Sequence, residues 1–252
     1  MSELETDRRG PVLIIRLNRP EARNALNAAL LSGIGKALTE AEADPQTRAV
    51  VLTGTGDRAF CAGMDLKAFA SGEKIGADAA GYNRLVRGEL TIPVVGAANG
   101  TAIGGGLELL LSCDVIVASS AAKFGFPEVK RGLYPAGGGT GVGTRIPLAV
   151  ALELTLTGDP IEARRAYEIG LINSVVPPEK VLEAGVELAD RIAANGPLGI
   201  AAIKELVRLG VTDPARAAER NKHWQPTVFG SADAREGAAA FMEKRQPVWK
   251  GK

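Results

Sequence analysis

The most informative stretch of this sequence is Asn99-Gly100-Thr101-Ala102-Ile103-Gly104-Gly105-Gly106-Leu107-Glu108-Leu109-Leu110-Leu111. The apolar run before it, residues 92–97, is typical of a buried strand, and residues 107–111 are typical of a buried helix. The glycine triplet therefore occupies a strand-to-helix turn. Glycine has no Cβ to keep a ligand off the main chain, and the first N–H groups of a helix lack internal partners. We expect this turn to donate hydrogen bonds to a partly negative ligand.

Glu108 adds a carboxylate to this turn. It follows Gly105 by three residues, so on a helix that begins near Gly104 it lies one turn further along the same side. A donor and a base side by side suggest catalysis. The alternative is structural, because glycines in such turns commonly serve tight packing and an early acidic residue complements the helix dipole.

The composition favours a globular protein without nucleic-acid or membrane partners. The 252 residues suit one large domain, or one domain with a small appendage, and can bury a full core. With 30 basic and 29 acidic residues the net charge is +1, and no run of like charges stands out. This balance argues against a nucleic-acid or membrane-surface protein, so a bound anion must be met by local groups.

Cysteine and histidine usage narrows the kinds of site. Cys61 and Cys113 are far apart and form no C-x-x-C pair, so the sequence indicates neither a disulfide framework nor a thiolate metal site, and it favours a reducing compartment. His223 is the one histidine and no G-x-S-x-G motif occurs, which argues against a His-rich metal site or a Ser-His-Asp triad. We expect no metal, a surface or interface position for His223, and proton transfer by carboxylates.

Two further absences bear on location and cofactors. Residues 1–10 are polar and show no signal peptide, and no apolar run reaches membrane-spanning length, so we expect a cytoplasmic protein. Residues 137–143 are dense in glycine but fit no G-x-G-x-x-G fingerprint, and no P-loop lysine follows. No nucleotide cofactor is therefore predicted.

Strands and helices alternate along the first part of the chain, which indicates an α/β protein. Besides residues 92–97, strand-like runs occupy residues 12–17, 48–53 and 114–118. Apolar residues at helical spacing predict a helix within residues 26–41.

From Pro147 onward the pattern is mostly helical. Helices are predicted between Pro178 and Asn195, over residues 198–209 with a stop at Gly210, and over residues 233–245. This tail has few large apolar groups and would make a thin core alone, so we expect it to pack on a partner.

A second glycine turn follows the strand at residues 48–53, in the segment Ala59-Phe60-Cys61-Ala62-Gly63-Met64-Asp65-Leu66-Lys67. Asp65 is placed to cap a short helix, which would leave the N–H of Met64 or its neighbour free to face a ligand. Residues 70–80, rich in Gly, Ala and Lys, suggest either a flap over a pocket or an ordinary surface loop.

Several motifs occur in a fixed order along the chain. They are residues 59–66, Asn99-Gly100 with the triplet at 104–106, Phe126-Pro127-Glu128, and Gly132 with Pro135 and Gly138-Gly139, flanked by Asn24-Ala25-Leu26 and by Phe241-Met242-Glu243-Lys244-Arg245. In this order they resemble the signature of the crotonase superfamily, the enoyl-CoA hydratase/isomerase family. The similarity spans nearly the whole chain.

The resemblance implies a fold, an assembly and a substrate class. The fold would be a spiral of β-β-α units over residues 1–197, with a C-terminal helical trimerisation region over residues 198–252, assembled as a homotrimer or a dimer of trimers. The substrate would be an acyl-CoA thioester, with coenzyme A as part of the substrate and no separate cofactor. In the family's pattern two backbone N–H groups hold the thioester oxygen, and they map to Met64 and Gly105.

The resemblance also implies the acid and base. The hydratases use two glutamates, which map to Glu108 and Glu128. We predict that Glu128 gives a proton to C2 and that Glu108 orients and activates the water that adds to C3. Burial and a neighbouring charge would raise a carboxyl pKa far enough for acid catalysis near neutral pH.

Further substrate contacts are carried over residue by residue. They map to Arg23, Ala25, Leu26, Ala62, Asp65, Leu66, Lys67, Ile103, Pro127, Tyr134, Phe241 and Lys244. Among these, Arg23, Lys67 and Lys244 are expected to hold the negatively charged CoA nucleotide, with Lys244 reaching a neighbouring subunit's ligand.

The leading prediction is an enoyl-CoA hydratase, a lyase of fatty acid metabolism. Met64 is bulkier than the residue often found there in fatty-acyl hydratases, and residues 233–251 resemble carnitinyl-CoA dehydratase, so a polar acyl group is an alternative. A one-base isomerase is the nearest other reaction, with hydrolase or decarboxylase chemistry further off. A non-catalytic acyl-CoA-binding or RNA-binding member is disfavoured by the glutamate pair and the balanced charge.

Overall fold

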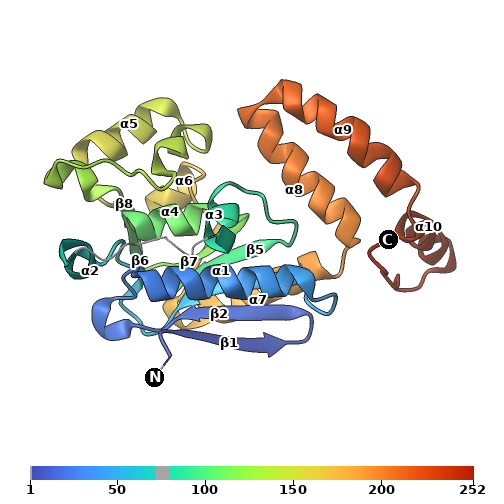
Figure 1. Ribbon diagram of the computed structural model, residues 1–252, viewed down its shortest axis with the longest axis horizontal. Coiled ribbons are helices and arrows are strands. Elements are labelled where there is room, and N and C mark those ends of the chain that lie inside the picture. Colours follow the sequence, from blue (N-terminus) through green and yellow to red (C-terminus); the bar gives the residue numbers. More distant parts are fainter. Residues whose placement is uncertain (1, 72–79) are drawn as a thin grey trace.

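The computed structural model describes residues 2–71 and 80–252, and its centre is a pair of β-sheets (Figure 1). In the described residues the larger sheet has six strands in the order β1-β2-β3-β5-β7-β10. These are β1 (Leu4–Arg9), β2 (Val12–Leu17), β3 (Ala49–Gly54), β5 (Val94–Ala98), β7 (Val115–Ser119) and β10 (Ser174–Val176). The smaller sheet, in the order β4-β6-β8-β9, contains β4 (Ala59–Cys61), β6 (Thr101–Ile103), β8 (Lys123–Gly125) and β9 (Ile161–Glu162).

The chain visits the two sheets in turn. β3 is followed by β4, β5 by β6, and β7 by β8, and each of these strands lies parallel to its neighbour from the preceding repeat. Helices α2 (Leu66–Ala70), α3 (Ala80–Val86) and α4 (Gly105–Leu111) fill the returns. This arrangement confirms the spiral of β-β-α units. Because β4 and β6 are parallel neighbours, the two glycine turns that follow them leave the sheet side by side.

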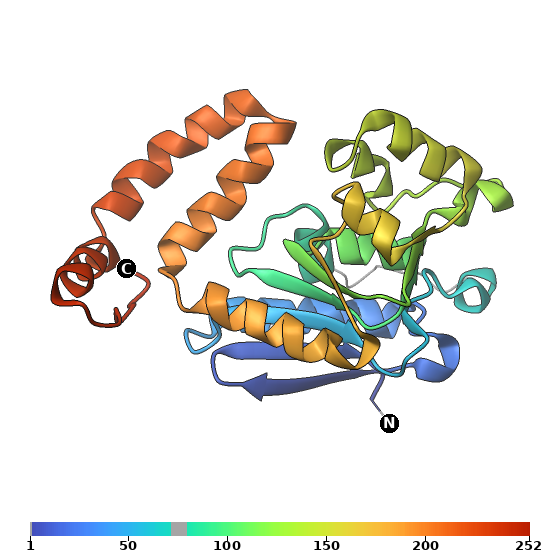
Figure 2. The same cartoon turned by 180° about the vertical axis from the view of Figure 1, so that it is seen from behind.

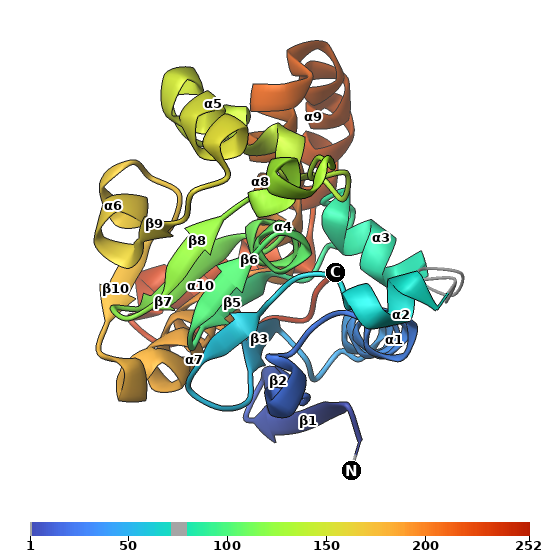
Figure 3. The same cartoon turned by 90° about the vertical axis from the view of Figure 1, so that its left-hand side faces the viewer.

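Helices α1 (Ala28–Ala43) and α7 (Val181–Ala193) cover opposite faces of the larger sheet, as Figure 3 shows. Successive side chains of a strand point to opposite faces. In β2, Ile15 lies in the group of buried apolar residues that includes those of α1, and Ile14 lies in the separate group that includes those of α7. A strand that is apolar at nearly every position is therefore buried on both sides.

The remaining α-helices lie in the second half of the chain. Two of them, α5 (Leu148–Thr157) and α6 (Ala163–Glu168), stay beside the smaller sheet, together with short 3-10 helices η2 (Pro127–Arg131) and η3 (Gly139–Thr144). Two further 3-10 helices, η1 (Pro20–Ala22) and η4 (Pro178–Lys180), precede α1 and α7.

The last three helices form an arm that leaves the core (Figure 2). They are α8 (Pro197–Thr212), α9 (Pro214–Phe229) and α10 (Ala232–Glu243). The α8 and α9 helices pair as a hairpin, in which Arg220 and the Trp224 indole of α9 both donate to the Glu205 carboxylate of α8. We call residues 197–252 the arm.

The predicted stop at Gly210 is wrong. Helix α8 runs through Gly210 to Thr212, because one glycine inside a helix costs only about 1 kcal/mol, which packing against α9 can offset. The helix ends where Pro214 forces its predecessor out of the helical region. Asp213 has φ −154° and ψ 79°, and its side chain caps the next helix by accepting from the Arg216 N–H.

The charged start of the chain forms β1, an antiparallel partner of β2 that the sequence analysis did not predict. His223 is exposed on α9, edge-on to Trp224 at a centroid distance of 5.6 Å. The flap predicted at residues 70–80 falls largely outside the described residues. In the described part of the chain, no helix has both the length and the apolar character needed to cross a membrane.

Candidate active site

The first backbone donor lies at the start of α4. Gly104, with φ 57°, is the residue before the helix, and its carbonyl accepts from the Leu107 and Glu108 N–H groups. The first N–H of a helix has no acceptor within the helix. Among the hydrogen bonds of the described residues, none uses the Gly105 N–H. This group is therefore available to a ligand.

The second donor lies in the turn after β4. Leu26 and Met64 form a parallel bridge, in which the Leu26 N–H donates to the Gly63 carbonyl (2.8 Å) and the Asp65 N–H donates to the Leu26 carbonyl (2.9 Å). This pattern uses both polar groups of Leu26 and neither of Met64. Within the described part of the chain the Met64 N–H consequently has no acceptor.

The two donors are close neighbours. A Cβ on Gly105 would lie 3.5 Å from the Met64 nitrogen, and a Cβ on Gly63 would lie 3.3 Å from the Gly105 nitrogen and 2.8 Å from the Ile103 carbonyl oxygen. Glycine at position 63, which also has φ 93°, thus permits the close approach of the turns. The geometry is suited to holding one oxygen atom between two N–H groups.

Glu108 is held beside these donors by a glycine loop. Its side chain is 8% exposed, and its Oε1 accepts from the Gly139 N–H at 2.8 Å, with a further hydrogen bond from the Gly137 N–H. A Cβ on Gly137 would lie 2.7 Å from Oε2, so a larger residue at this position would displace the carboxylate. Burial raises the pKa of Glu108, and the two backbone donors act in the opposite direction.

Glu128 approaches the same turn from η2. Its Oε1 lies 2.9 Å from the position of a Cβ on Gly104, whereas Oε2 is buried and has no hydrogen-bond partner in the described residues. Burial raises the pKa of Glu128, and the charge of Glu108 raises it further. Two carboxylates that disfavour each other's ionisation can share one proton between them.

Most of the other predicted contacts gather around this centre. Residues 23–26 and 62–65 run side by side, since the Ala62 N–H donates to the Arg23 carbonyl and Leu26 bridges Met64. This pairing brings together Arg23, Ala25, Leu26, Ala62, Asp65, Leu66 and Lys67. Ile103 ends β6 beside the glycine triplet, and Pro127 precedes Glu128. Asp65 caps α2 as predicted, because its Oδ1 accepts from the Lys67 and Ala68 N–H groups.

Tyr134, which follows the η2 helix that carries Glu128, is 67% exposed. Two other predicted contacts lie outside this group. Phe241, 86% exposed, and Lys244 lie on or just after α10, at the far end of the arm from α4 (Figure 1). Within one chain these two residues do not meet the glutamate pair.

Two features of the site escaped the sequence analysis. In the sequence, the glycines at 137 and 139 were considered only as a possible nucleotide fingerprint, which they do not match, although they supply the donors to Glu108.

Tyr82 of α3 packs against the main core, and burial together with the charges of Cys61 and Glu108 raises its pKa. Val86, one turn later on α3, lies 3.4 Å from the position of a Cβ on Gly138. Helix α3 therefore borders the site, a tertiary contact that no local motif signals.

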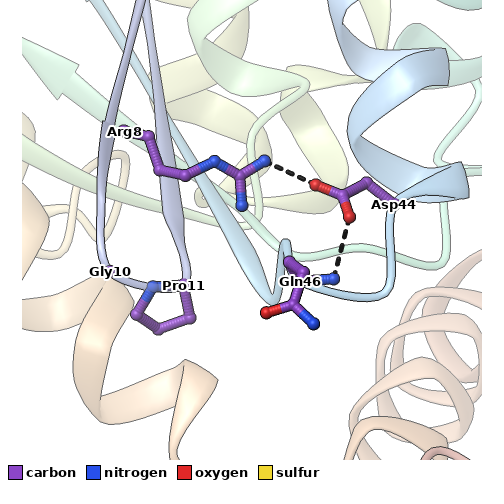
Figure 4. A pocket seen from close by; sticks show the side chains of 5 residues that line it. All are labelled: Arg8, Gly10, Pro11, Asp44 and Gln46. Atoms are coloured by element: carbon purple, nitrogen blue, oxygen red, sulfur yellow. Dashed lines mark hydrogen bonds and ion pairs between the residues drawn. The ribbon is translucent and has the colours of Figure 1, made fainter.

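A cavity of about 550 Å³ lies elsewhere, at the turn between β1 and β2 (Figure 4). It is lined by Arg8, Gly10, Pro11, Asp44 and Gln46. The Arg8 guanidinium pairs with the Asp44 carboxylate, which also accepts from the Gln46 N–H, so these charged groups satisfy one another. None of the predicted site residues lines it.

Comparison with known proteins agrees with this geometry. The family model described as enoyl-CoA hydratase/isomerase matches residues 7–252. Carnitinyl-CoA dehydratase of Salmonella typhimurium is 41% identical over 265 residues, covering 100% of both chains.

Solved structures give the same result. The crystal structure of an enoyl-CoA hydratase from Mycobacterium tuberculosis superposes with a TM-score of 0.93 at 42% identity, and that of a carnitinyl-CoA hydratase from Mycobacterium avium with a TM-score of 0.78 at 44% identity. Both comparisons cover 100% of each chain. The chain therefore belongs to the enoyl-CoA hydratase/isomerase family, the crotonase superfamily.

Proposed function

We propose that this protein is an enoyl-CoA hydratase that reversibly adds water, in the syn sense, across the 2,3-double bond of a 2-enoyl-CoA thioester. The observation that carries the proposal is the pair of carboxylates, Glu108 and Glu128, beside the N–H groups of Met64 and Gly105, which have no acceptor among the described residues. The family membership supports a CoA thioester as the substrate.

In the proposed mechanism the thioester oxygen accepts hydrogen bonds from Met64 and Gly105. Glu108, whose charge the glycine loop stabilises, takes a proton from a water molecule while the oxygen of that water forms a bond to C3. The electron pair of the double bond moves toward the thioester oxygen, and the resulting enolate is held by the two donors. One such donor contributes about 3 to 4 kcal/mol to lowering a barrier of this kind.

The second proton transfer completes the addition. Glu128 gives its proton to C2 as the enolate collapses, and the two carboxyls then hold the one proton taken from water, which returns the pair to its starting charge. Both transfers are assigned to carboxylates, so the mechanism requires no metal and no cofactor besides the CoA of the substrate.

The test is turnover of a 2-enoyl-CoA and a 3-enoyl-CoA by the wild type, Glu108→Gln and Glu128→Gln. We expect each substitution to lower the hydration kcat by about a hundredfold or more, and the double variant to lose little beyond either single one, because both groups act on one step. Thioester affinity should persist, since the donors are backbone groups. If Glu108→Gln retained near wild-type turnover of either substrate while Glu128→Gln abolished it, the enzyme would be a one-base isomerase.

A second candidate is a dehydratase of a polar acyl-CoA. Its support is that curated relatives at 41% identity are carnitinyl-CoA dehydratases and that one similar structure is a carnitinyl-CoA hydratase. Hydration and dehydration are one reaction in two directions, so the proposed mechanism serves both. The ratio of kcat/KM for a straight-chain 2-enoyl-CoA and for one that bears a 4-trimethylammonium group distinguishes the candidates.

We further propose that basic groups hold the CoA nucleotide and that the chain works as a homotrimer or dimer of trimers. Arg23 and Lys67 lie on the two paired segments beside the site, and Lys244 is exposed on the arm. The arm carries exposed apolar side chains, among them Ile203, Val207 and Val211 at 61 to 63% exposure. A cytoplasmic location is supported by two buried, unpaired cysteines, Cys61 and Cys113.

A further inference from the structure

Arg19 is a mostly buried cation that contacts both segments of the Leu26–Met64 bridge. Its side chain is 14% exposed. One guanidinium nitrogen donates to the Ala25 carbonyl at 2.6 Å, and another donates to Oδ2 of Asp65 at 2.9 Å. Ala25 precedes Leu26 and Asp65 follows Met64, so one rigid group spans the bridge.

The Arg19 backbone is fixed from the other side. Its N–H donates to Oδ1 of Asn24 at 2.9 Å, and its carbonyl accepts from the Asn24 N–H at 2.8 Å. Asn24 is fully buried, has φ 56°, and donates from its side chain to the Thr55 and Ala59 carbonyls. The guanidinium therefore starts from an anchored position beside β4 and has little freedom to follow a moving partner.

Asp65 is the second half of this arrangement. Its Oδ1 accepts from the Lys67 and Ala68 N–H groups at the start of α2, and its Oδ2 accepts from Arg19. The hydrogen bond from Arg19 is the leading reason that the pKa of Asp65 lies below its ordinary value. On one side of Met64, the Gly63 carbonyl accepts from the Leu26 N–H. On the other side, Asp65 is bonded to Leu26 through its N–H and to Arg19 through its carboxylate. The backbone that carries the Met64 N–H is therefore held on both sides.

We propose that Arg19 is a positioning residue for the reaction, which clamps residues 25 and 65 together and so fixes the direction of the Met64 N–H toward the thioester oxygen. This inference rests on the proposed function for its effect on kcat. A planar guanidinium reaches two acceptors in fixed directions, whereas the single ammonium of lysine does not hold both in the same plane. Arg19 touches no reacting atom, so its effect passes through Met64.

The experiment compares Arg19→Met, Arg19→Lys and Asp65→Asn with a matched control, Arg16→Met. Arg16 lies three residues earlier, on β2, and pairs with Asp7 at 3.7 Å away from the bridge. We expect Arg19→Met to lower the hydration kcat by about tenfold to a hundredfold, less than outright loss of an oxyanion donor, with KM nearly unchanged. Arg19→Lys should recover part of the loss, and Arg16→Met should behave as wild type.

A spectroscopic readout tests the clamp without relying on turnover. Donors that polarise a conjugated thioester carbonyl shift its absorbance to longer wavelength, so cinnamoyl-CoA is bound to each variant in a Glu128→Gln background, which suppresses its hydration. The shift should shrink in Arg19→Met and in Asp65→Asn, and the double variant should lose no more than either alone. Asp65→Asn keeps the size of the cap and serves if Arg19→Met does not fold.

The outcomes separate the clamp from the proposed function. A variant that melts at lower temperature but keeps the wild-type shift and kcat while folded would show that Arg19 is only a stabilising ion pair. If the wild type hydrated no enoyl thioester, the proposed function would be wrong. Even then, a smaller spectral shift in Arg19→Met than in the wild type would support the clamp.

Discussion

The two carboxylates of the site differ in what surrounds them. Glu108 receives hydrogen bonds from Gly139 and Gly137, which stabilise its ionised form, whereas Oε2 of Glu128 is buried and finds no partner among the residues that the structure describes. Ionised Glu128 also faces the charge of Glu108. This contrast supports Glu128 as the acid and Glu108 as the base, and it means that the folded protein disfavours the negative charge that Glu128 carries when it ionises.

The cost of that charge can be measured as stability. The pKa of Glu128 is raised by folding above the value of about 4.3 expected in the unfolded chain. The stabilising contribution of the raised pKa is complete below pH 4 and is lost as the pH rises through the folded pKa. Glu128→Gln cannot ionise, so its Tm should exceed that of the wild type at pH 8, and the difference should disappear near pH 4.

Thermal unfolding at the two pH values decides this prediction. Glu153→Gln, which replaces an exposed glutamate on α5, is the control and should shift Tm little at either pH. A gain in Tm of equal size at both pH values would mean that packing, rather than charge, separates glutamate from glutamine at position 128.

At the scale of elements, local patterns predicted the parts of the fold that neighbouring residues determine. The strand at residues 12–17 was predicted with its observed bounds, because burial on both faces gives a short run of apolar residues. Both glycine turns were placed correctly, because their backbone conformation requires glycine within a few residues. β1 was missed because it is an edge strand with exposed, charged side chains, which a hairpin partner orders.

Other parts could not be predicted because distant residues decide them. Strands β4, β6, β8 and β9 have two or three residues each, too few for a periodic pattern. Gly139, whose N–H donates to Glu108, lies 31 residues further along the chain. Local patterns indicated the two donor turns and Glu108 as a base, whereas the role of Glu128 and the pairing of Met64 with Gly105 around one oxygen came from resemblance to a family. The structure supplies the geometry of these four residues.

The direction of the arm is also set by distant residues. The Asp114 carboxylate, at the start of β7, accepts from Lys204 and Arg208 of α8, each at 2.8 Å, and from the Val94 N–H of β5. The Lys204 side chain is 7% exposed, and its ammonium also donates to the Ile92 carbonyl. Burial lowers the pKa of Lys204, which the charge of Asp114 opposes.

Removing Asp114 should therefore loosen the arm and destabilise the fold. Asp114→Ala leaves the buried Lys204 ammonium without its counter-charge, and we expect a loss of about 3 kcal/mol in the free energy of unfolding. Urea unfolding measures it. Asp159→Ala breaks an exposed ion pair with Lys130 and is the control, which should change stability little. Equal, small losses in both variants would show that the cluster does not anchor α8.

For the whole molecule, the arm separates residues that the proposed function needs together. Lys244 and Phe241 lie at its far end, apart from the glutamate pair in the same chain (Figure 1). On α8, Ile203, Val207 and Val211 recur every four residues and are all more than 60% exposed. Exposed apolar groups in a stripe are typical of a surface that another chain covers. An assembly would both bury this stripe and bring a neighbour's Lys244 to the site.

The last prediction follows from this requirement. Lys244→Ala should raise the KM for the CoA thioester by about fivefold, the worth of one exposed ion pair of about 1 kcal/mol, and leave kcat nearly unchanged. Lys222→Ala, which replaces an exposed lysine on α9, is the control and should leave KM as in the wild type.

Val207→Asp should lower the mass found by sedimentation and weaken thioester binding. Adding Lys244→Ala to Val207→Asp should weaken binding no further. An unchanged KM for Lys244→Ala at low ionic strength would remove Lys244 from the CoA site.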